Sequence, residues 1–120
     1  MSVFDSLVGQ DHVVEVLEVA AHDAAIEPAG PTTTHAWLFI GPPGSGRSNA
    51  AIAFGAALVC PQAGCGVCED CVAVLSGNHP DVEVVRPEGL SYKTEEARNL
   101  VGRADMAPTR ARWHVIVLED

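Results

Sequence analysis

Apolar residues recur at helical spacing between residues 11 and 25, which predicts the first long helix of the chain. One face of this helix would carry Val13, Val14, Leu17 and Ala21. Asp11 stands where an N-cap residue is expected. The following residues, 27–34, hold two prolines and a glycine, so the helix cannot continue and a loop is predicted.

A short apolar run at residues 35–40 comes after this loop and predicts a buried strand. Residues 41–46 are rich in glycine and proline, and residues 48–59 are almost all small and apolar, which suits a buried helix despite Gly55. The predicted order is therefore strand, glycine-rich loop, helix.

The second half of the chain repeats the alternation of strand and helix. Short strands are predicted at residues 81–85 and 113–118, because both runs are rich in branched apolar residues. Between them, Thr94 and two glutamates open a helix that should run to about Ala104, with Pro108 marking its far end. Alternating strands and helices predict an α/β fold whose parallel sheet is covered on both faces.

Composition and charge limit the classes of function. At 120 residues and 48% apolar, the chain can form one domain or part of one. Its 16 acidic and 7 basic residues give a net charge of −9, which argues against this segment gripping nucleic acid by itself. No export signal and no run of about 18 apolar residues is present, so a cytoplasmic protein without membrane contact is expected.

Residues 41–48, GPPGSGRS, match the phosphate-loop template G-x-x-x-x-G-K-[ST] at every position except the lysine. In such loops, backbone N–H groups at a helix N-terminus converge on phosphate oxygens, and the hydroxyl binds magnesium. Arg47 replaces the lysine with a bulkier planar cation, so ATP and magnesium should bind weakly or not at all. The alternative is a simple turn between strand and helix. The candidate nucleotide-binding residues here are Gly41, Gly44, Ser45, Gly46, Arg47 and Ser48.

Glu119 and Asp120 follow the last apolar run and resemble the second nucleotide motif of ATPases with its two acidic residues in reversed order. In those enzymes the aspartate helps to hold magnesium and the glutamate orients water, a division that depends on the reach of each carboxylate. With the order exchanged, neither residue has the length for its role. The alternative is an acidic strand end that faces solvent.

Four cysteines, Cys60, Cys65, Cys68 and Cys71, have the spacing C-x4-C-x2-C-x2-C, which is typical of metal ligands. Four thiolates would make a closed, structural zinc site, because catalytic zinc keeps one position open for water. The alternatives are a redox or disulfide role and four unrelated buried thiols. His79 is near enough in sequence to substitute as a ligand, but residues 78–81 are better interpreted as a turn into the next strand.

Together these motifs resemble bacterial DNA polymerase III clamp-loader subunits of the AAA+ class. The resemblance rests on residues 4–10, FDSLVGQ, on the phosphate loop, on the cysteine cluster directly after its helix, on His79-Pro80-Asp81 and on the late acidic strand. Residues 8–10 are similar to the family segment beside the adenine of bound nucleotide. The cysteine cluster is similar to the zinc module of gamma/tau and delta prime subunits.

Within that family, Arg47 and the pair Glu119 and Asp120 favour the delta prime subunit, which has no ATPase cycle of its own, over the gamma/tau motor. The resemblance implies a P-loop NTPase fold with a parallel sheet flanked by helices and a zinc knuckle inserted at about residues 60–71. Residues 1–120 would be the N-terminal part of an incomplete AAA+ domain. A Ser-Arg-Cys motif and the collar domain would lie beyond it.

The implied function is that of a non-motor subunit in the ring that loads the sliding clamp onto primed DNA. Its partners would be the delta and gamma/tau subunits and, through the complex, the clamp and primed DNA. One alternative is an ATP-hydrolysing gamma/tau-type subunit. Another is a zinc-knuckle interaction module, although the acidic Glu69 and Asp70 beside the cysteines disfavour contact with nucleic acid.

Overall fold

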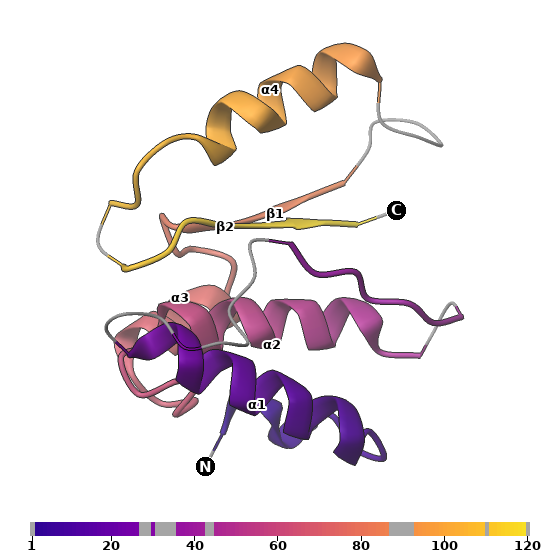
Figure 1. Cartoon of the computed structure of the whole chain (residues 1–120), viewed down its shortest axis with the longest axis vertical. Helices are drawn as coiled ribbons and strands as arrows, with labels where there is room; N and C mark the ends of the chain where they lie inside the picture. The colour runs from indigo at the N-terminus through magenta and orange to yellow at the C-terminus, as the bar shows by residue number, and fades with distance from the viewer. Residues whose placement is uncertain are drawn as a thin grey trace.

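The computed structural model describes residues 2–26, 30, 36–42, 45–86, 93–109 and 111–119. Figure 1 shows two strands in the middle of the molecule, with one helix on one face and the remaining helices on the other. In chain order, the elements are the 3-10 helix η1 (Val3–Ser6), α1 (Asp11–Ala25), α2 (Arg47–Val59), α3 (Glu69–Leu75), β1 (Val82–Val85), α4 (Thr94–Ala104) and β2 (Val115–Leu118).

The two strands pair in parallel, with Val82 opposite Val115 and Val85 opposite Leu118. Parallel neighbours require a crossover connection, and here α4 supplies it on the face opposite α2. The prediction of an α/β fold with a parallel sheet and helices on both faces is confirmed for the described residues.

Helix α2 forms the centre of the core, because its small side chains allow close approach on several sides. Ala53, Ala56 and Ala57 are all buried. A Cβ atom built on Gly55 would lie 3.4 Å from Val82 and 3.6 Å from Val115, so the helix backbone runs close to both strands. On the other side, α2 packs against η1 and α1 through Phe4 and Leu17, among other residues. The core therefore lies between α2, the sheet and the N-terminal helices.

The strand predicted at residues 35–40 is wrong for the part that the structure describes. Residues 36–40 form no ladder with β1 or β2, and Leu38 and Ile40 are 84% and 85% exposed. A strand needs a hydrogen-bonded neighbour, and this segment instead packs Trp37 and Phe39 against Phe54. The Trp37 and Phe54 rings meet edge to face at 5.1 Å. His35 lies outside the described residues.

The start of α1 also differs from expectation. Gln10, not Asp11, is the N-cap residue, and no side chain caps the helix there. Asp11 still favours the helix, because a carboxylate in the first turn interacts well with the helix dipole. On the predicted apolar face, Leu17 and Ala21 are buried, whereas Val13 is 36% exposed. None of the helices in the part of the chain that the structure describes is long and apolar enough to cross a membrane.

Candidate functional site

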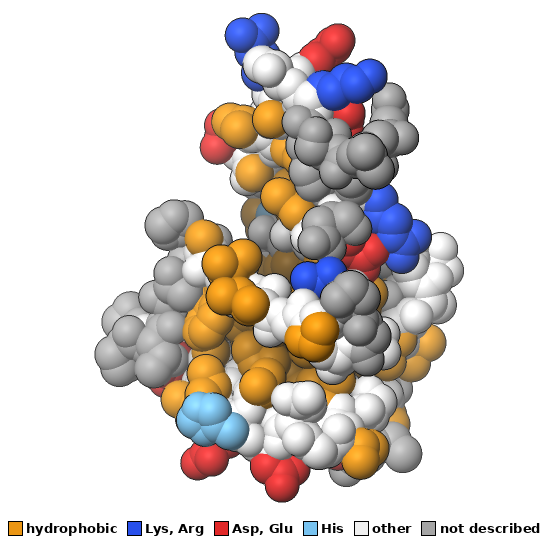
Figure 2. Space-filling model, turned by 90° about the vertical axis from the view of Figure 1, so that its right-hand side faces the viewer, with side chains coloured by type: hydrophobic (Ala, Val, Ile, Leu, Met, Phe, Trp, Pro, Cys, Tyr) orange, Lys and Arg blue, Asp and Glu red, His pale blue; other side chains and the backbone are white. Residues whose placement is uncertain are grey.

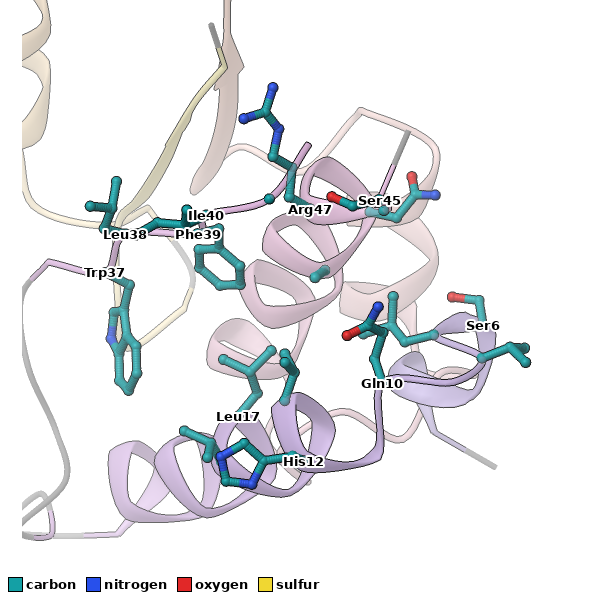
Figure 3. Close-up of a pocket in the computed structure, with 18 of the residues that line it drawn as sticks. Ser6, Gln10, His12, Leu17, Trp37, Leu38, Phe39, Ile40, Ser45 and Arg47 are labelled. Carbon is teal, nitrogen blue, oxygen red and sulfur yellow. The ribbon is translucent and has the colours of Figure 1, made fainter. Parts of the chain in front are cut away.

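A cleft of about 510 Å³ lies where three separate segments of the chain meet. Its walls come from residues between Ser6 and Leu17, from the segment Trp37 to Pro42, and from residues between Ser45 and Ala50. Figure 3 shows Trp37 and Phe39 directed toward α1 and Leu17 directed back toward them, across the space between the three segments. The cleft therefore brings the glycine-rich loop together with Val8 and Gln10, as the resemblance implied.

The glycine-rich loop ends in a conformation that depends on glycine. Gly46 is the N-cap of α2 and has a φ of 87°, in the left-handed region that other residues adopt at a cost. A Cβ on Gly41 would come within 2.5 Å of the Ser45 hydroxyl oxygen. The Ser45 N–H donates to the Pro42 carbonyl at 3.1 Å. Helix α2 begins directly after this loop, and a helix N-terminus is suited to binding an anion.

The rest of the cleft is mainly apolar. Val13 and Val16 of α1 line one wall, and Leu38 and Ile40 line the other. Figure 2 shows hydrophobic side chains gathered around a hollow on one face of the molecule. An apolar slot next to a helix N-terminus has the right chemistry for a ligand with a flat apolar part and an anionic part.

Arg47 is the first residue of α2, and the structure places it at the edge of the cleft. Figure 3 shows its guanidinium pointing away from Leu17 and His12. Ser48 follows on the exposed side of the helix and is not among the residues that line the cleft. Gly44 lies outside the described residues. Among the predicted phosphate-loop residues, the cleft is thus lined by Gly41, Ser45, Gly46 and Arg47.

Glu119 does not line the cleft either. It follows β2, its N–H donates to the Val85 carbonyl at 2.9 Å, and its carboxylate forms an ion pair with the Arg86 guanidinium. The Glu119 side chain is only 10% exposed, so this pair orients the carboxylate. Asp120 lies outside the described residues. The structure therefore gives Glu119 a structural partner at the ends of both strands.

The four predicted cysteine ligands converge at the opposite end of α2. Cys60 follows the helix directly, and Cys71 lies in α3. The four Sγ atoms are all within 4.8 Å of one another, with Cys60 3.8 Å from Cys65 and 3.6 Å from Cys68. A tetrahedral ion with Zn–S bonds of about 2.3 Å would need sulfurs about 3.8 Å apart. The cluster can therefore hold a zinc ion. The spacing is too wide for disulfide bonds, and all four cysteines are free.

Backbone N–H groups point at the sulfurs, as thiolate ligands require. Gly66 N–H donates to Cys71 Sγ at 3.4 Å, and Cys71 N–H donates to Cys68 Sγ at the same distance. Burial raises the pKa of Cys68 and of Cys71. Burial acts on Cys60 too, but N–H groups of the following turn donate to its sulfur and lower its pKa to about 7. The cluster thus contains one readily formed thiolate, Cys60, and two thiols, Cys68 and Cys71, whose ionisation burial opposes.

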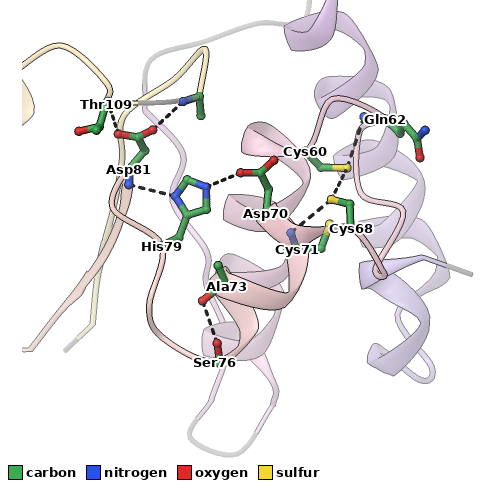
Figure 4. Close-up of polar contacts among 11 residues, drawn as sticks. Cys60, Gln62, Cys68, Asp70, Cys71, Ala73, Ser76, His79, Asp81 and Thr109 are labelled. Atoms are coloured by element: carbon green, nitrogen blue, oxygen red, sulfur yellow. Dashed lines mark hydrogen bonds and ion pairs between the residues drawn. The ribbon is translucent and has the colours of Figure 1, made fainter.

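A buried polar pair next to the cluster could not be foreseen from the sequence. His79 Nε2 lies 2.8 Å from Asp70 Oδ1, and His79 Nδ1 accepts the Asp81 N–H at 3.0 Å (Figure 4). Both ring nitrogens are engaged, so His79 does not substitute for a cysteine as a metal ligand, and residues 78–81 lead from α3 into β1 as predicted. The Asp81 carboxylate is buried and accepts the N–H groups of Thr109 and Ala111. In the sequence, a histidine and an aspartate on either side of a proline were the signal for this buried pair, but their burial depends on distant residues.

Two residues before β2 hold the end of α1, which was also missed. Trp113 Nε1–H donates to the Ala24 carbonyl at 3.1 Å, and Arg112 donates to the Ile26 carbonyl at 3.0 Å. Carbonyls at a helix C-terminus lack intrahelical partners, so these bonds satisfy them. They fix α1, a wall of the cleft, to the segment that enters β2.

The fold and its two sites define a small α/β protein with a parallel sheet, a cleft at a glycine-rich loop and a four-cysteine cluster that can hold a zinc ion. The chain belongs to the family described as DNA polymerase III, delta subunit, which matches residues 10–120. This confirms the resemblance to bacterial DNA polymerase III clamp-loader subunits.

Curated relatives include subunits of two kinds. The DNA polymerase III subunit gamma/tau of Mycobacterium tuberculosis H37Rv is 33% identical over 122 residues, which cover 98% of this chain and 20% of the relative. The DNA polymerase III subunit delta' of Bacillus subtilis 168 is 39% identical over 70 residues, 56% of this chain and 21% of the relative. STICHEL-like 2 of Arabidopsis thaliana is 32% identical over 98% of the chain and 13% of its own length. The chain thus spans about a fifth of the DNA polymerase III relatives. No solved structure matches it significantly.

Proposed function

We propose that this chain is part of a non-motor, delta prime-like subunit of a DNA polymerase III clamp loader. Residues 1–120 would form the N-terminal part of its AAA+ domain, with the zinc knuckle at about residues 60–71. In the assembled ring it would help to load the sliding clamp onto primed DNA in the cytoplasm, beside the delta and gamma/tau subunits. The net charge of −9 supports contact with DNA through the complex and not through this segment alone.

The observation that carries the proposal is the place of the Glu119 carboxylate. Phosphoryl transfer is catalysed by positioning and charge stabilisation, so acidic groups must face the phosphates. Here Glu119 is paired with Arg86 and does not line the cleft. Arg47 replaces the lysine that reaches the terminal phosphates of a working phosphate loop. Binding geometry has been kept in part, while the groups needed for turnover have been changed.

Weak nucleotide binding is compatible with this function. The N-terminal N–H groups of α2 still offer an anion site, whatever side chain stands at position 47. The apolar walls of the cleft suit a nucleobase, with Val8 and Gln10 at one end. We therefore expect ATP with magnesium to bind weakly and not to be hydrolysed.

The cysteine cluster supports a structural zinc ion, held by Cys60, Cys65, Cys68 and Cys71. Four thiolates would fill every coordination position of the ion. The ion would therefore cross-link the end of α2 to α3 and would not bind water or substrate. Cys60 and Cys71 are 3% and 0% exposed, which suits a closed site. Zinc removal should therefore affect folding, not nucleotide chemistry.

A gamma/tau-type motor is the second candidate, and one observation favours it. The gamma/tau relative from Mycobacterium tuberculosis matches 98% of this chain, whereas the delta' relative from Bacillus subtilis matches 56%. Overall similarity does not decide the matter, however, because turnover depends on a few positioned groups. Arg47 and Glu119 are the residues that separate the two candidates.

The test is to measure ATP binding and ATP hydrolysis separately on the full-length subunit, alone and with the other ring subunits. The wild type should bind weakly and show no turnover above background. Arg47→Lys should tighten ATP binding. Adding Glu119→Asp and Asp120→Glu to that variant should begin to recover ATP turnover. Robust wild-type hydrolysis that is lost in Ser48→Ala would overturn the proposal in favour of the motor.

A further inference from the structure

A chain of buried hydrogen bonds runs from the cysteine cluster to the sheet. It starts at Asp70, in the first turn of α3, which lies between two of the four cysteines. Its carboxylate contacts Nε2 of His79, whose side chain is fully buried. His79 in turn contacts the backbone of Asp81, the residue directly before β1. Figure 4 shows these three side chains in a row between α3 and the loop at Thr109.

The direction of the hydrogen bonds follows from the contacts. The Asp81 N–H can only donate, so Nδ1 of His79 must be the unprotonated, accepting nitrogen. The ring hydrogen of the neutral tautomer is therefore on Nε2, which donates to Asp70. The histidine is thus held at both nitrogens and has one orientation.

Asp81 connects His79 to β2 through hydrogen bonds. Asp81 is 1% exposed, and its carboxylate accepts two N–H groups, those of Thr109 and Ala111. Its carbonyl accepts the Val115 N–H at 2.7 Å, at the first residue of β2. A carboxylate buried this deeply is costly unless it is hydrogen-bonded, so the turn before β2 cannot move without breaking these bonds.

We infer that Asp70, His79 and Asp81 are positioning residues that couple metal binding at the cysteine cluster to the order of Thr109, Ala111 and Val115. A metal that draws Cys68 and Cys71 together would fix the first turn of α3 and, with it, the Asp70 carboxylate. His79 and Asp81 then hold the turn that sets the start of β2. The inference rests on the zinc site of the proposed function. It adds that the zinc supports the sheet as well as the knuckle.

Hydrogen–deuterium exchange on the full-length subunit tests this coupling, with bound zinc measured on each sample. Zinc should slow exchange of the Thr109, Ala111 and Val115 amides by about fivefold or more, the lower end of typical coupling. Asp70→Ala should abolish that slowing while its cysteines still bind zinc. Because coupling is reciprocal, Asp70→Ala should also weaken zinc binding by the same factor.

Two matched variants separate a positioning role from a general loss of stability. Asp70→Asn keeps an acceptor for the His79 hydrogen and should restore the zinc effect. Glu69→Ala removes the adjacent exposed carboxylate from the same helical turn and should leave the zinc effect unchanged. If Asp70→Ala does not fold, Asp70→Ser is measured instead, because serine is shorter than aspartate and cannot reach His79.

Each outcome is decisive. Zinc that binds but slows none of the three amides in the wild type overturns the inference and leaves the zinc site standing. Equal slowing in Asp70→Ala and wild type also overturns it. A wild type that binds no zinc overturns both the inference and the structural zinc of the proposed function. The inference is supported if zinc slows amide exchange in every variant except those whose side chain at position 70 cannot accept a hydrogen bond from His79.

Discussion

The two ends of α2 differ in how completely their predicted residues come together. At the C-terminal end, all four cysteines converge within 4.8 Å of one another. At the N-terminal end, the glycine-rich loop reaches the cleft, but Ser48 and Glu119 do not line it. A site built from one short segment is fixed by local geometry, whereas a catalytic site needs several segments distant in sequence to be placed correctly relative to one another. In the part of the chain that the structure describes, the predicted residues of the first kind of site come together completely and those of the second only in part.

The largest effect is expected from breaking the cysteine cluster. Cys71→Ala should reduce zinc from one equivalent to far less, because three thiolates hold zinc less tightly than four. Losing a structural metal should lower the free energy of unfolding by about 4 kcal/mol or more. Elemental analysis and urea unfolding measure the two effects. Val67→Ser, at an exposed position between the ligands, is the control and should keep its zinc.

A second large effect is expected at Asp81. Asp81→Ala would leave the N–H groups of Thr109 and Ala111 without their acceptor, and each lost partner costs about 1–3 kcal/mol. The free energy of unfolding should therefore fall by about 2–6 kcal/mol, measured by urea unfolding of zinc-loaded protein. The exposed Asp105→Ala should change it by less than about 0.5 kcal/mol. Equal effects of the two substitutions would contradict the structural role of Asp81.

The cysteine cluster should also respond to pH, whereas the backbone groups of the cleft should not. Zinc displaces protons from the thiols, so its affinity must fall as the pH falls. Cys68 and Cys71 have raised pKa values and release protons to zinc throughout, and Cys60 joins them as the pH drops through its pKa of about 7. Affinity should therefore fall at least about a hundredfold per pH unit, because at least two protons are displaced for each zinc bound. Competition with a chelator measures this, and an affinity unchanged between about pH 8 and pH 6 would rule out thiolate ligands.

The smallest effect should come from the glycine-rich loop. Gly46→Ala meets no atom within 4 Å, so only its left-handed backbone opposes the change, at about 1–2 kcal/mol. Gly102→Ala is the matched control, because it also meets open space but lies inside α4. There the change should stabilise the protein by about 0.5–1 kcal/mol. Thermal unfolding should show a lower melting temperature for Gly46→Ala and a higher one for Gly102→Ala. Changes of the same sign would contradict the requirement for glycine in the left-handed conformation at position 46.

Local patterns allowed the helices to be predicted well. Helix α1 has the predicted bounds Asp11–Ala25, and α4 runs over Thr94–Ala104 as expected. The prolines and glycine of residues 27–34 marked the end of α1, and Thr94 with the two glutamates after it marked the start of α4. Helix α3 was not predicted, because it begins inside the cysteine segment, where Cys68 serves as its N-cap by accepting the Cys71 N–H. Ligand spacing masked the helical signal there.

Features that depend on distant residues could not be predicted. The apolar run at 36–40 has the composition of a strand, but a strand forms only where another strand pairs with it. The buried bonds of His79 and the contact of Trp113 with the end of α1 join residues far apart in sequence. For the candidate sites, spacing predicted the cysteine cluster, while the ion pair of Glu119 with Arg86 required the parallel register of the two strands.

Helix α2 has a mechanical role that follows from its position. It spans 13 residues, so it is a rigid rod of about 20 Å with the glycine-rich loop at one end and the cysteines at the other. Its middle is clamped between the sheet and the N-terminal helices. A rod clamped in this way resists sliding along its axis, so changes at one tip displace the other very little. A substitution in the glycine-rich loop should therefore leave the geometry of the cysteine cluster unchanged, and a substitution in the cluster should leave the loop unchanged.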